Sequence, residues 1–274
     1  MNMGHDEREK FDILAKKVRK NILWMTAEAG GGHYMSSLSS VEILLSLYFY
    51  ELRYDVNNLG DPDRDRFVLS KGHAAPALYA VMAEAGYFPV EELRTLRRYG
   101  SRLQGHPVLH RLPGLESSSG SLGQGISTAV GMALAGKIEA RRYRVFVLLG
   151  DGECQEGLVW EAAMAAAHFK LDNLIAIIDG NKLQISGPTD KIMSLGNLKA
   201  KWEAFGWGVI NVNGHDISDL LAAYEKMKSV KNKPVALIAD TVKGCGVPFI
   251  ENNLNYHTVP LNEEELKKAL ECLE

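Results

Sequence analysis

Residues 145–152 read VFVLLGDG, and residues 174–182 read LIAIIDGNK. Each apolar run has the length and composition of a strand buried inside a sheet. Each run is followed by a glycine-containing turn with a polar side chain, Asp151 in the first and Asn181 in the second. The alanine-rich residues 157–167 between them predict a helix. Two strands joined through a helix are parallel, so both turns are expected at the carboxyl edge of one sheet, where open α/β sheets bind ligands.

These two turns have a purely structural explanation and a chemical one. Aspartate followed by glycine is a common turn sequence, so either motif alone is explained by local geometry. Two such motifs, each after its own strand, favour a site. Carboxylate and carboxamide oxygens suit a hard cation such as Mg²⁺, whose other ligands are water and phosphate oxygens. The start of the following helix offers free N–H groups to such a phosphate.

The composition narrows the class of protein. With 274 residues, of which 46% are hydrophobic and 24% charged, the chain has the make-up of a globular protein with a sizeable core. The net charge of −3 gives no electrostatic support for binding nucleic acid or an anionic membrane. The three cysteines lack zinc-site spacing and favour a reducing compartment, so we predict a cytoplasmic protein. Residues 1–8 contain no apolar signal core, and no apolar run is long enough to span a membrane.

The order of the expected elements predicts the architecture. Helical periodicity covers residues 6–29 and 40–52, which form an N-terminal helical part over about 6–52. The remaining expected elements are strands at 66–70, 208–212 and 235–239, and helices at 73–87, 90–99, 124–140, 218–230 and about 262–273. Residues 100–123 are rich in Gly, Ser, Pro and His and are expected to form a long functional loop. We predict one α/β domain over 1–274, with a doubly wound, mostly parallel sheet and helices on both faces.

Histidines next to glycine are the second signal of a site. Five of the eight histidines lie in glycine-containing turns or at the ends of predicted elements: His33, His73, His106, His215 and His257. Any one of them alone is explained as a surface or structural histidine. Glycine directly before histidine recurs in several of these loops, where the backbone can approach a ligand closely. Imidazoles at such positions are suited to binding phosphate and hydroxyl oxygens near neutral pH.

The motifs also occur in a distinctive order. They are Ala29-Gly30-Gly31-Gly32-His33, LSKGHAAPALY at 69–79, Gly105-His106-Pro107, GSLGQG at 120–125, Gly150-Asp151-Gly152 through Gly157, and Asp179-Gly180-Asn181-Lys182. This ordered set resembles the N-terminal, diphosphate-binding domain (the PP domain) of transketolase from about residue 10 to Leu261. The resemblance implies the thiamine diphosphate-binding fold.

The resemblance also implies site residues and cofactors. Mg²⁺, or Ca²⁺ or Mn²⁺ in its place, would be bound by Asp151, Asn181 and the backbone carbonyl of Leu183. Thiamine diphosphate would be held by His73, Gly120, Ser121, Leu122, Gly152, Glu153, Asn181, Ile185 and His257. The sugar would contact His33, His106 and His257, and these three with His73 form the implied catalytic set. Glu156 would lie where two copies of the domain meet.

The chain departs from the family pattern in three respects. Ser121 stands where many members have proline, which changes little if backbone atoms make the contact. Thr258 stands where glycine usually follows the histidine, which bears on the direction in which His257 points. The sequence stops at Glu274, whereas a pyrimidine-binding domain with an activating glutamate follows in full-length members. We therefore expect that domain on a separate partner chain, and two copies of each chain in the complex (α2β2).

The implied function is that of the N-terminal subunit of a split transketolase in the pentose phosphate pathway. Such an enzyme moves a two-carbon ketol unit from a ketose phosphate to an aldose phosphate. The alternatives are a chain of a 1-deoxyxylulose-5-phosphate synthase-like enzyme or of a 2-oxo acid dehydrogenase (alpha subunit). A non-catalytic cofactor-binding module is a third. That module would not need the histidines, and the glycine motifs match neither a Walker P-loop nor the dinucleotide pattern.

Overall fold

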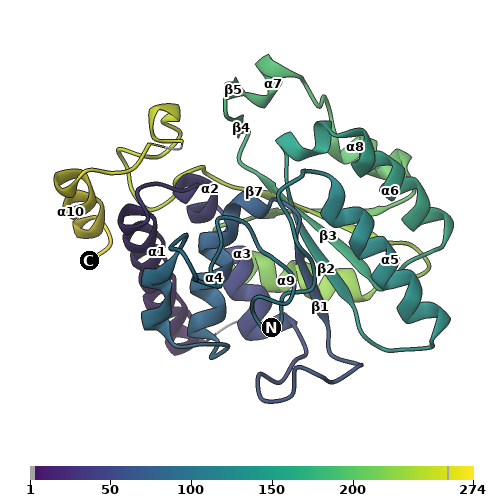
Figure 1. Cartoon of the computed structure of the whole chain (residues 1–274). Coiled ribbons are helices and arrows are strands. Elements are labelled where there is room, and N and C mark those ends of the chain that lie inside the picture. The colour runs from purple at the N-terminus through teal and green to yellow at the C-terminus, as the bar shows by residue number, and fades with distance from the viewer. Residues whose placement is uncertain (1–3, 258) are drawn as a thin grey trace.

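The computed structural model describes residues 4–257 and 259–274 and confirms the predicted α/β class. Its centre is a parallel five-stranded sheet in the order β1-β2-β3-β7-β6, with helices on both faces (Figure 1). The strands are β1 (Arg66–Leu69), β2 (Val145–Gly150), β3 (Leu174–Gly180), β6 (Gly208–Asn213) and β7 (Val235–Asp240). Strands β2 and β3 are buried almost throughout, which is why both read as unbroken apolar runs.

The register of the two central strands sets the position of the site. Gly150 at the end of β2 is paired with Asp179 near the end of β3. The two glycine-rich turns therefore leave the same edge of the sheet side by side, as the sequence predicts. The Asp151 amide donates a hydrogen bond to the Asp179 carbonyl oxygen at 3.1 Å, which joins the turns directly.

The sheet separates two hydrophobic cores, and alternate residues of a strand belong to different ones. On β2, Phe146 and Leu148 pack into one core, while Val145, Val147 and Leu149 pack into the other. The first core is covered by α1 (His5–Glu28), α2 (Tyr34–Leu38), α3 (Val41–Ser46), α4 (Ala75–Glu84) and α9 (Ile217–Lys228). The second is covered by α5 (Gln124–Ile138), α6 (Gly157–His168) and α8 (Leu198–Ala204). Figure 1 shows these two sets on opposite sides of the sheet.

The helix predicted at 90–99 is wrong. The structure has only a short 3₁₀ segment there, η3 (Val90–Thr95). Arg97 has a positive φ of 59°, which a helix does not allow, and its amide donates to the Leu103 carbonyl at 2.8 Å. Residues 100–123 contain no helix or strand, as expected for the predicted loop.

Several short elements were not predicted. The helix expected at 40–52 is α3 followed by a π-helical turn, η1 (Leu47–Glu51), and 3₁₀ turns occur at η2 (Gly72–Ala74), η4 (Gly152–Gln155) and η5 (Leu254–Tyr256). A small hairpin of β4 (Leu183–Gln184) and β5 (Gly187–Pro188) precedes α7 (Thr189–Ile192). This hairpin and α7 project beyond the carboxyl edge of the sheet (Figure 1).

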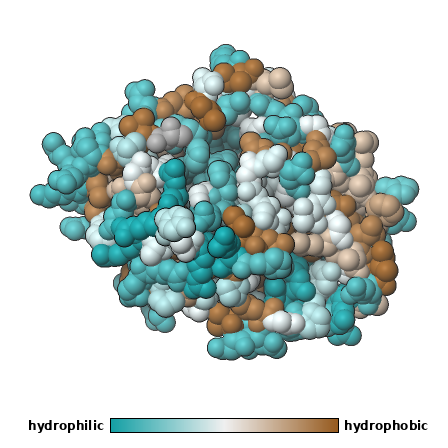
Figure 2. All heavy atoms as spheres, viewed as in Figure 1, coloured by the Kyte–Doolittle hydropathy of each residue, from teal (hydrophilic) through white to brown (hydrophobic). Residues whose placement is uncertain are grey.

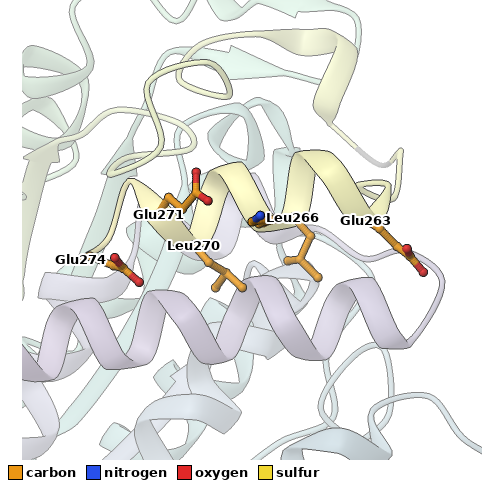
Figure 3. Close-up of a pocket in the computed structure, with 6 residues that line it drawn as sticks. Glu263, Leu266, Leu270, Glu271 and Glu274 are labelled. Carbon is orange, nitrogen blue, oxygen red and sulfur yellow. The ribbon is translucent and has the colours of Figure 1, made fainter.

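The last helix, α10 (Glu263–Glu271), lies on α1. Asn262 and Glu265 form a reciprocal capping box at its start. Leu266 and Leu270 point toward the neighbouring helix and pack on the first core (Figure 3). The hollow at this helix is lined by Glu263, Leu266, Lys267, Leu270, Glu271 and Glu274, and none of the predicted site residues belongs to it.

Polar and apolar side chains are interspersed on the face shown in Figure 2, with apolar atoms gathered along the edge formed by α5 and α6. Exposed large apolar side chains on or directly after these helices are Ile138, Met164 and Phe169. Among residues 4–257 and 259–274, no helix is both long enough and apolar enough to cross a membrane.

Candidate active site

The Asp151 carboxylate is buried and held in one orientation by backbone groups. Its Oδ1 accepts the Gly152 N–H at 2.8 Å, and its Oδ2 accepts the Lys182 N–H at 2.6 Å. Asn181 directly precedes Lys182 and is also buried. The structure therefore brings Asp151 and Asn181 together, and it leaves lone pairs of both side-chain oxygens available for a further ligand.

The surroundings of Asp151 favour the protonated form of its carboxyl group. Burial, and then the negative charge of Asp179, raise the pKa of Asp151 to about 6. A cation bound at this position would lower the pKa of Asp151 again, because its positive charge would stabilise the ionised carboxylate. Clusters of three or more His, Cys, Asp or Glu side chains suited to a metal are absent from the described part of the chain. The expected ligand set, one carboxylate with a carboxamide and a backbone carbonyl, is not of that kind.

The third expected metal ligand, the Leu183 carbonyl, faces a lysine. The Lys243 ammonium donates a hydrogen bond to this oxygen at 2.9 Å, and Lys243 is only 2% exposed. Burial, and then the charge of Lys71, lower the pKa of Lys243 to about 8. Lys243 is thus a buried cation next to the expected metal position. It was not predicted, because nothing in the sequence distinguishes it from a surface lysine.

The four histidines of the implied catalytic set meet at one place. Ring centroids lie 5.3 Å apart for His33 and His73, 5.5 Å for His33 and His257, and 6.4 Å for His33 and His106. They come from four segments: the start of α2, η2, the loop after η3, and the segment after η5. A set of side chains so far apart in sequence converges only through the fold.

The site keeps these imidazoles neutral. Burial is the largest cause of the lowered pKa in all four, and it lowers the pKa of His33 and of His257 to about 4. Nearby cations add to the effect, Lys243 for His257 and Lys71 for His73. The Nδ1 atoms of His33 and His257 are buried with no hydrogen-bond partner in the described part of the chain. Unpartnered buried nitrogens at a common centre fit a polar ligand with several oxygens.

The loop that carries Gly120, Ser121 and Leu122 lies against the histidines. A Cβ on Gly72 would lie 2.5 Å from the Ser119 hydroxyl and 2.8 Å from the Gly120 amide nitrogen, so only glycine fits before His73. Gly120 has a φ of 142° and packs against the His106 ring. The loop backbone is therefore fixed next to two of the histidines, with Gly120 and Ser121 exposed and Leu122 half-buried.

Glu153 and Ile185 are placed differently from the other predicted cofactor residues. The buried Glu153 carboxylate accepts from the Ser70 hydroxyl and from the amides of Gly123 (2.8 Å) and Gly150 (3.1 Å). Because its oxygens are engaged by the protein, we expect any contact of Glu153 with a ligand to use its backbone. Ile185, at the tip of the β4–β5 hairpin, is 71% exposed.

Gly152 and Glu156 lie in the turn after β2. A Cβ on Gly152 would approach Gln184 to 3.5 Å, which places the Gly152 backbone against the β4–β5 hairpin. Glu156 is exposed at the start of α6 and packs against Gly123. Glu156 is therefore at the surface, where the resemblance implies a contact between two copies of the domain.

A buried polar network behind the histidines was also not predicted. The Asp179 carboxylate accepts from the Lys71 ammonium, from the Ser39 hydroxyl at 2.6 Å and from the Thr241 hydroxyl. Lys71 also donates to the Ser36 carbonyl at 3.0 Å. The motifs Ser70-Lys71-Gly72-His73 and Asp179-Gly180-Asn181 contain these residues, but the sequence does not reveal that they pair.

The segment that carries His257 is anchored on both sides. The Tyr34 hydroxyl donates to the Val259 carbonyl at 2.9 Å, and the Tyr256 hydroxyl donates to Glu265 on α10 at 3.0 Å. Thr258, whose departure from the family pattern bears on the aim of His257, lies outside the described residues.

Comparison with known proteins identifies the family of the chain. The profile of the family described as "Transketolase, thiamine diphosphate binding domain" matches residues 12–273. The chain is 45% identical over 260 residues to the 6-deoxy-6-sulfo-D-fructose transketolase subunit SqwG of Clostridium sp. (strain MSTE9), covering 95% of this chain and 94% of that protein. It is 44% identical over 273 residues to an apulose-4-phosphate transketolase subunit from Actinobacillus succinogenes, covering 99% of this chain and 98% of that protein.

Solved structures give the same family. The transketolase of Campylobacter jejuni superposes with a TM-score of 0.91 at 33% identity. The match covers 100% of this chain and 43% of that one, so the chain corresponds to one part of the longer enzyme. The family and fold predicted from the sequence are confirmed. The chain belongs to the transketolase family of thiamine diphosphate-dependent transferases and corresponds to the thiamine diphosphate-binding domain of that family.

Proposed function

We propose that this chain is the thiamine diphosphate-binding subunit of a two-chain transketolase that transfers a two-carbon ketol unit from a ketose phosphate to an aldose phosphate. The observation that carries the proposal is the convergence of His33, His73, His106 and His257 at one place. A module that binds only a phosphate does not require four neutral histidines. An enzyme that binds a sugar does use such side chains, because they can form hydrogen bonds with its several hydroxyl groups. The same cluster favours ketol transfer over the 2-oxo acid dehydrogenase alternative.

The donor set fits a divalent metal and a diphosphate. Mg²⁺ would be held by Asp151, Asn181 and the Leu183 carbonyl, with Ca²⁺ or Mn²⁺ as substitutes. The Lys243 ammonium, which contacts that carbonyl, would turn to the diphosphate once the metal takes the oxygen. The diphosphate would also meet His73, Asn181 and the backbone at Gly120–Leu122 and Gly152. When bound, thiamine diphosphate supplies the carbanion-stabilising chemistry of ketol transfer.

The protein's own contribution to the reaction is to bind, orient and exchange protons. His33, His106 and His257 would bind the hydroxyl and carbonyl oxygens of the sugar. As neutral imidazoles they can both donate and accept a hydrogen bond, and each can hold a proton in transit. Their burial keeps that neutral form dominant near neutral pH.

The proposed partner is a second chain that carries the pyrimidine-binding domain. Two relatives that match this chain over nearly their whole length are themselves named as transketolase subunits. We further propose a second copy of this chain in the complex, making α2β2, with Glu156 at the contact. The exposed apolar side chains of Met164 on α6 and of Phe169 directly after it belong to the helix that Glu156 precedes, and they support that surface. Free cysteines and the sugar chemistry support a cytoplasmic place in pentose phosphate metabolism.

Reconstitution tests the proposal. The chain is purified alone and together with the proposed partner chain that carries the pyrimidine-binding domain, and both samples are assayed for ketol transfer and thiamine diphosphate binding. We expect activity and tight binding only in the mixture, together with a larger particle in light scattering. Full activity from the rigorously purified single chain contradicts the two-chain proposal. Binding without any ketol transfer to phosphorylated aldoses contradicts the proposed reaction.

A further inference from the structure

A second buried charge network lies apart from the histidine cluster and is centred on Glu42. This residue of α3 is 7% exposed. Its Oε1 lies 2.7 Å from the Arg19 guanidinium on α1, and its Oε2 lies 2.9 Å from His215 Nδ1. Burial alone would raise the pKa of Glu42, but Arg19 and His215 hold it below its usual range. Glu42 is therefore a carboxylate with a partner on each oxygen.

Both partners of Glu42 reach the same backbone turn after β7. His215 Nε2 accepts the N–H of Val242 at 2.8 Å, and Arg19 Nε donates to the carbonyl oxygen of Cys245 at 3.0 Å. The turn itself is closed by the Cys245 amide, which donates to the Val242 carbonyl at 3.2 Å. The two side chains that hold Glu42 thus also hold the two ends of this turn.

The hydrogen bonds of His215 fix its protonation state. Burial lowers its pKa, whereas contacts with Cys245 and Glu42 raise it to about 10, which alone would favour a charged ring. The Val242 N–H excludes a charged ring. It donates a hydrogen bond to Nε2, which must therefore carry a lone pair and not a proton. A histidine that accepts at Nε2 and donates to a carboxylate at Nδ1 is neutral, with its proton on Nδ1. The network thus selects one tautomer of His215.

Lys243 lies inside this turn, and its ammonium contacts the Leu183 carbonyl at the proposed metal position. The next residue, Gly244, donates its N–H to the Met35 carbonyl of α2 at 3.0 Å. A Cβ at Gly246 would lie 2.8 Å from Arg19 Cδ, so the turn packs tightly on the arginine. Lys243 therefore has little freedom to change its backbone position without breaking the contacts of Glu42's two partners.

We infer that Glu42, His215 and Arg19 are positioning residues for Lys243: they hold the backbone on both sides of it and aim its ammonium at the metal and diphosphate site. The inference rests on the proposed function, since the cofactor is what gives Lys243 its role. It also separates His215 from the other glycine-linked histidines. His215 acts on the backbone behind the site and contacts neither sugar nor cofactor.

Two substitutions of His215 separate its two bonds. In His215→Asn the side-chain amide occupies the place of Nδ1 and keeps a donor for Glu42, but the acceptor for Val242 is lost. In His215→Gln an oxygen can occupy the place of Nε2 and keeps that acceptor. In the complex with the partner chain, we expect His215→Asn to weaken thiamine diphosphate binding about tenfold in isothermal titration with Mg²⁺. We expect His215→Gln to recover most of the affinity, and His168→Gln, on the exposed end of α6, to change nothing.

A double-mutant cycle distinguishes positioning from a general structural role. If His215 acts through Lys243, the loss caused by His215→Asn disappears when Lys243 is already alanine. Losses in cofactor affinity that add in full in the double variant overturn the inference. So does an unchanged affinity in His215→Asn. Should that variant fail to fold, Glu42→Gln, which keeps the shape but removes the charge facing Arg19, takes its place in the same cycle.

A measurement on the wild-type chain needs no cofactor. Nitrogen chemical shifts of His215 near neutral pH are expected to show a protonated Nδ1 and an unprotonated Nε2. A ring protonated on both nitrogens, or on Nε2 alone, overturns the inference. If the wild-type complex binds no thiamine diphosphate, the proposed function fails, while the tautomer still reports on the network itself.

Discussion

Lys71 and Asp179 form an ion pair inside the protein, with side-chain exposures of 1% and 0%. Burial alone would raise the pKa of Asp179, but the Lys71 ammonium and the hydroxyl donors hold it well below its usual range. The pair joins the end of β3, which leads to Asn181, to the turn that leads to His73. It therefore links the proposed metal site to the histidine cluster.

Removal of the charge on Asp179 should destabilise the whole fold. In Asp179→Asn the Lys71 ammonium stays buried without its counter-charge, and breaking one partner of such a pair costs about 3–5 kcal/mol. Urea unfolding followed by circular dichroism measures the loss. The control is Asp240→Asn, which breaks an exposed pair with Lys182 and should change stability by less than about 1 kcal/mol. Equal losses in the free energy of unfolding for the two substitutions would show that the buried pair contributes no more to stability than the exposed pair.

Removal of the Asp151 carboxylate should abolish cofactor retention and leave the fold intact. The side chain lies at the edge of the sheet, and its expected task is to offset the charge of a dication beside a diphosphate. Isothermal titration of the Asp151→Ala complex should therefore show no tight thiamine diphosphate binding, with a melting temperature close to that of the wild type. Asp190→Ala, on the exposed surface of α7, is the matched control. An unchanged cofactor affinity in Asp151→Ala would contradict the assignment of Asp151 as a metal ligand.

His106 and His73 should divide the work between sugar and cofactor. His106 lies in the long loop, so His106→Ala should lower turnover and raise KM for the sugar with little change in cofactor affinity. His73 packs beside the Gly120 loop, so His73→Ala should first raise the cofactor requirement. Loss of one such hydrogen bond is expected to cost about one to two decades in affinity. The division is wrong if both variants shift only the cofactor affinity.

Stability should fall in mild acid because of the buried histidines. Burial, and then the charge of Lys243, lower the pKa of His257 to about 4, whereas a histidine in an unfolded chain has a pKa of about 6.5. Below about pH 6.5 the unfolded chain therefore binds a proton that the folded chain does not. The contribution of His257 to stability is complete above that pH and falls by up to about 1.4 kcal/mol per pH unit down to about 4.

Comparison of the wild type with His257→Gln isolates this effect. Asp151, whose raised pKa acts in the opposite direction between its usual value and about 6, is present in both proteins and cancels. Denaturant unfolding between pH 7 and 5 should show a flatter dependence in the variant. Parallel curves for the two proteins would mean that His257 is not neutral in the fold.

The sequence predicts the central strands of the sheet well, because the features that identify them are local in the sequence. The apolar run before Asp151 is long and ends in glycine, and β2 lies where that run predicts it. The spacing of Val90, Leu93 and Leu96 also looks helical, but the positive φ of Arg97 and its bond to Leu103 end the helix early. The two-residue strands β4 and β5 are too short to produce any periodic pattern.

The missed site residues share a physical cause. Lys71 and Lys243 matter because they are buried cations, and burial follows from tertiary structure rather than from neighbours in sequence. The same holds for His215, whose glycine-linked motif is indistinguishable from that of His73. Only the positions of Glu42 and Val242 show that it belongs to a different network.

The hydrogen bond from Tyr34 to Val259 joins positions 225 residues apart. Such a contact requires the chain to be synthesised past Val259, and the entropy of closing so large a loop must be compensated by other native contacts. The histidine cluster beside it, which brings His33 and His257 together, depends on the same long-range closure. In the complex with the partner chain, a cofactor bound by this cluster would therefore stabilise the folded state by mass action.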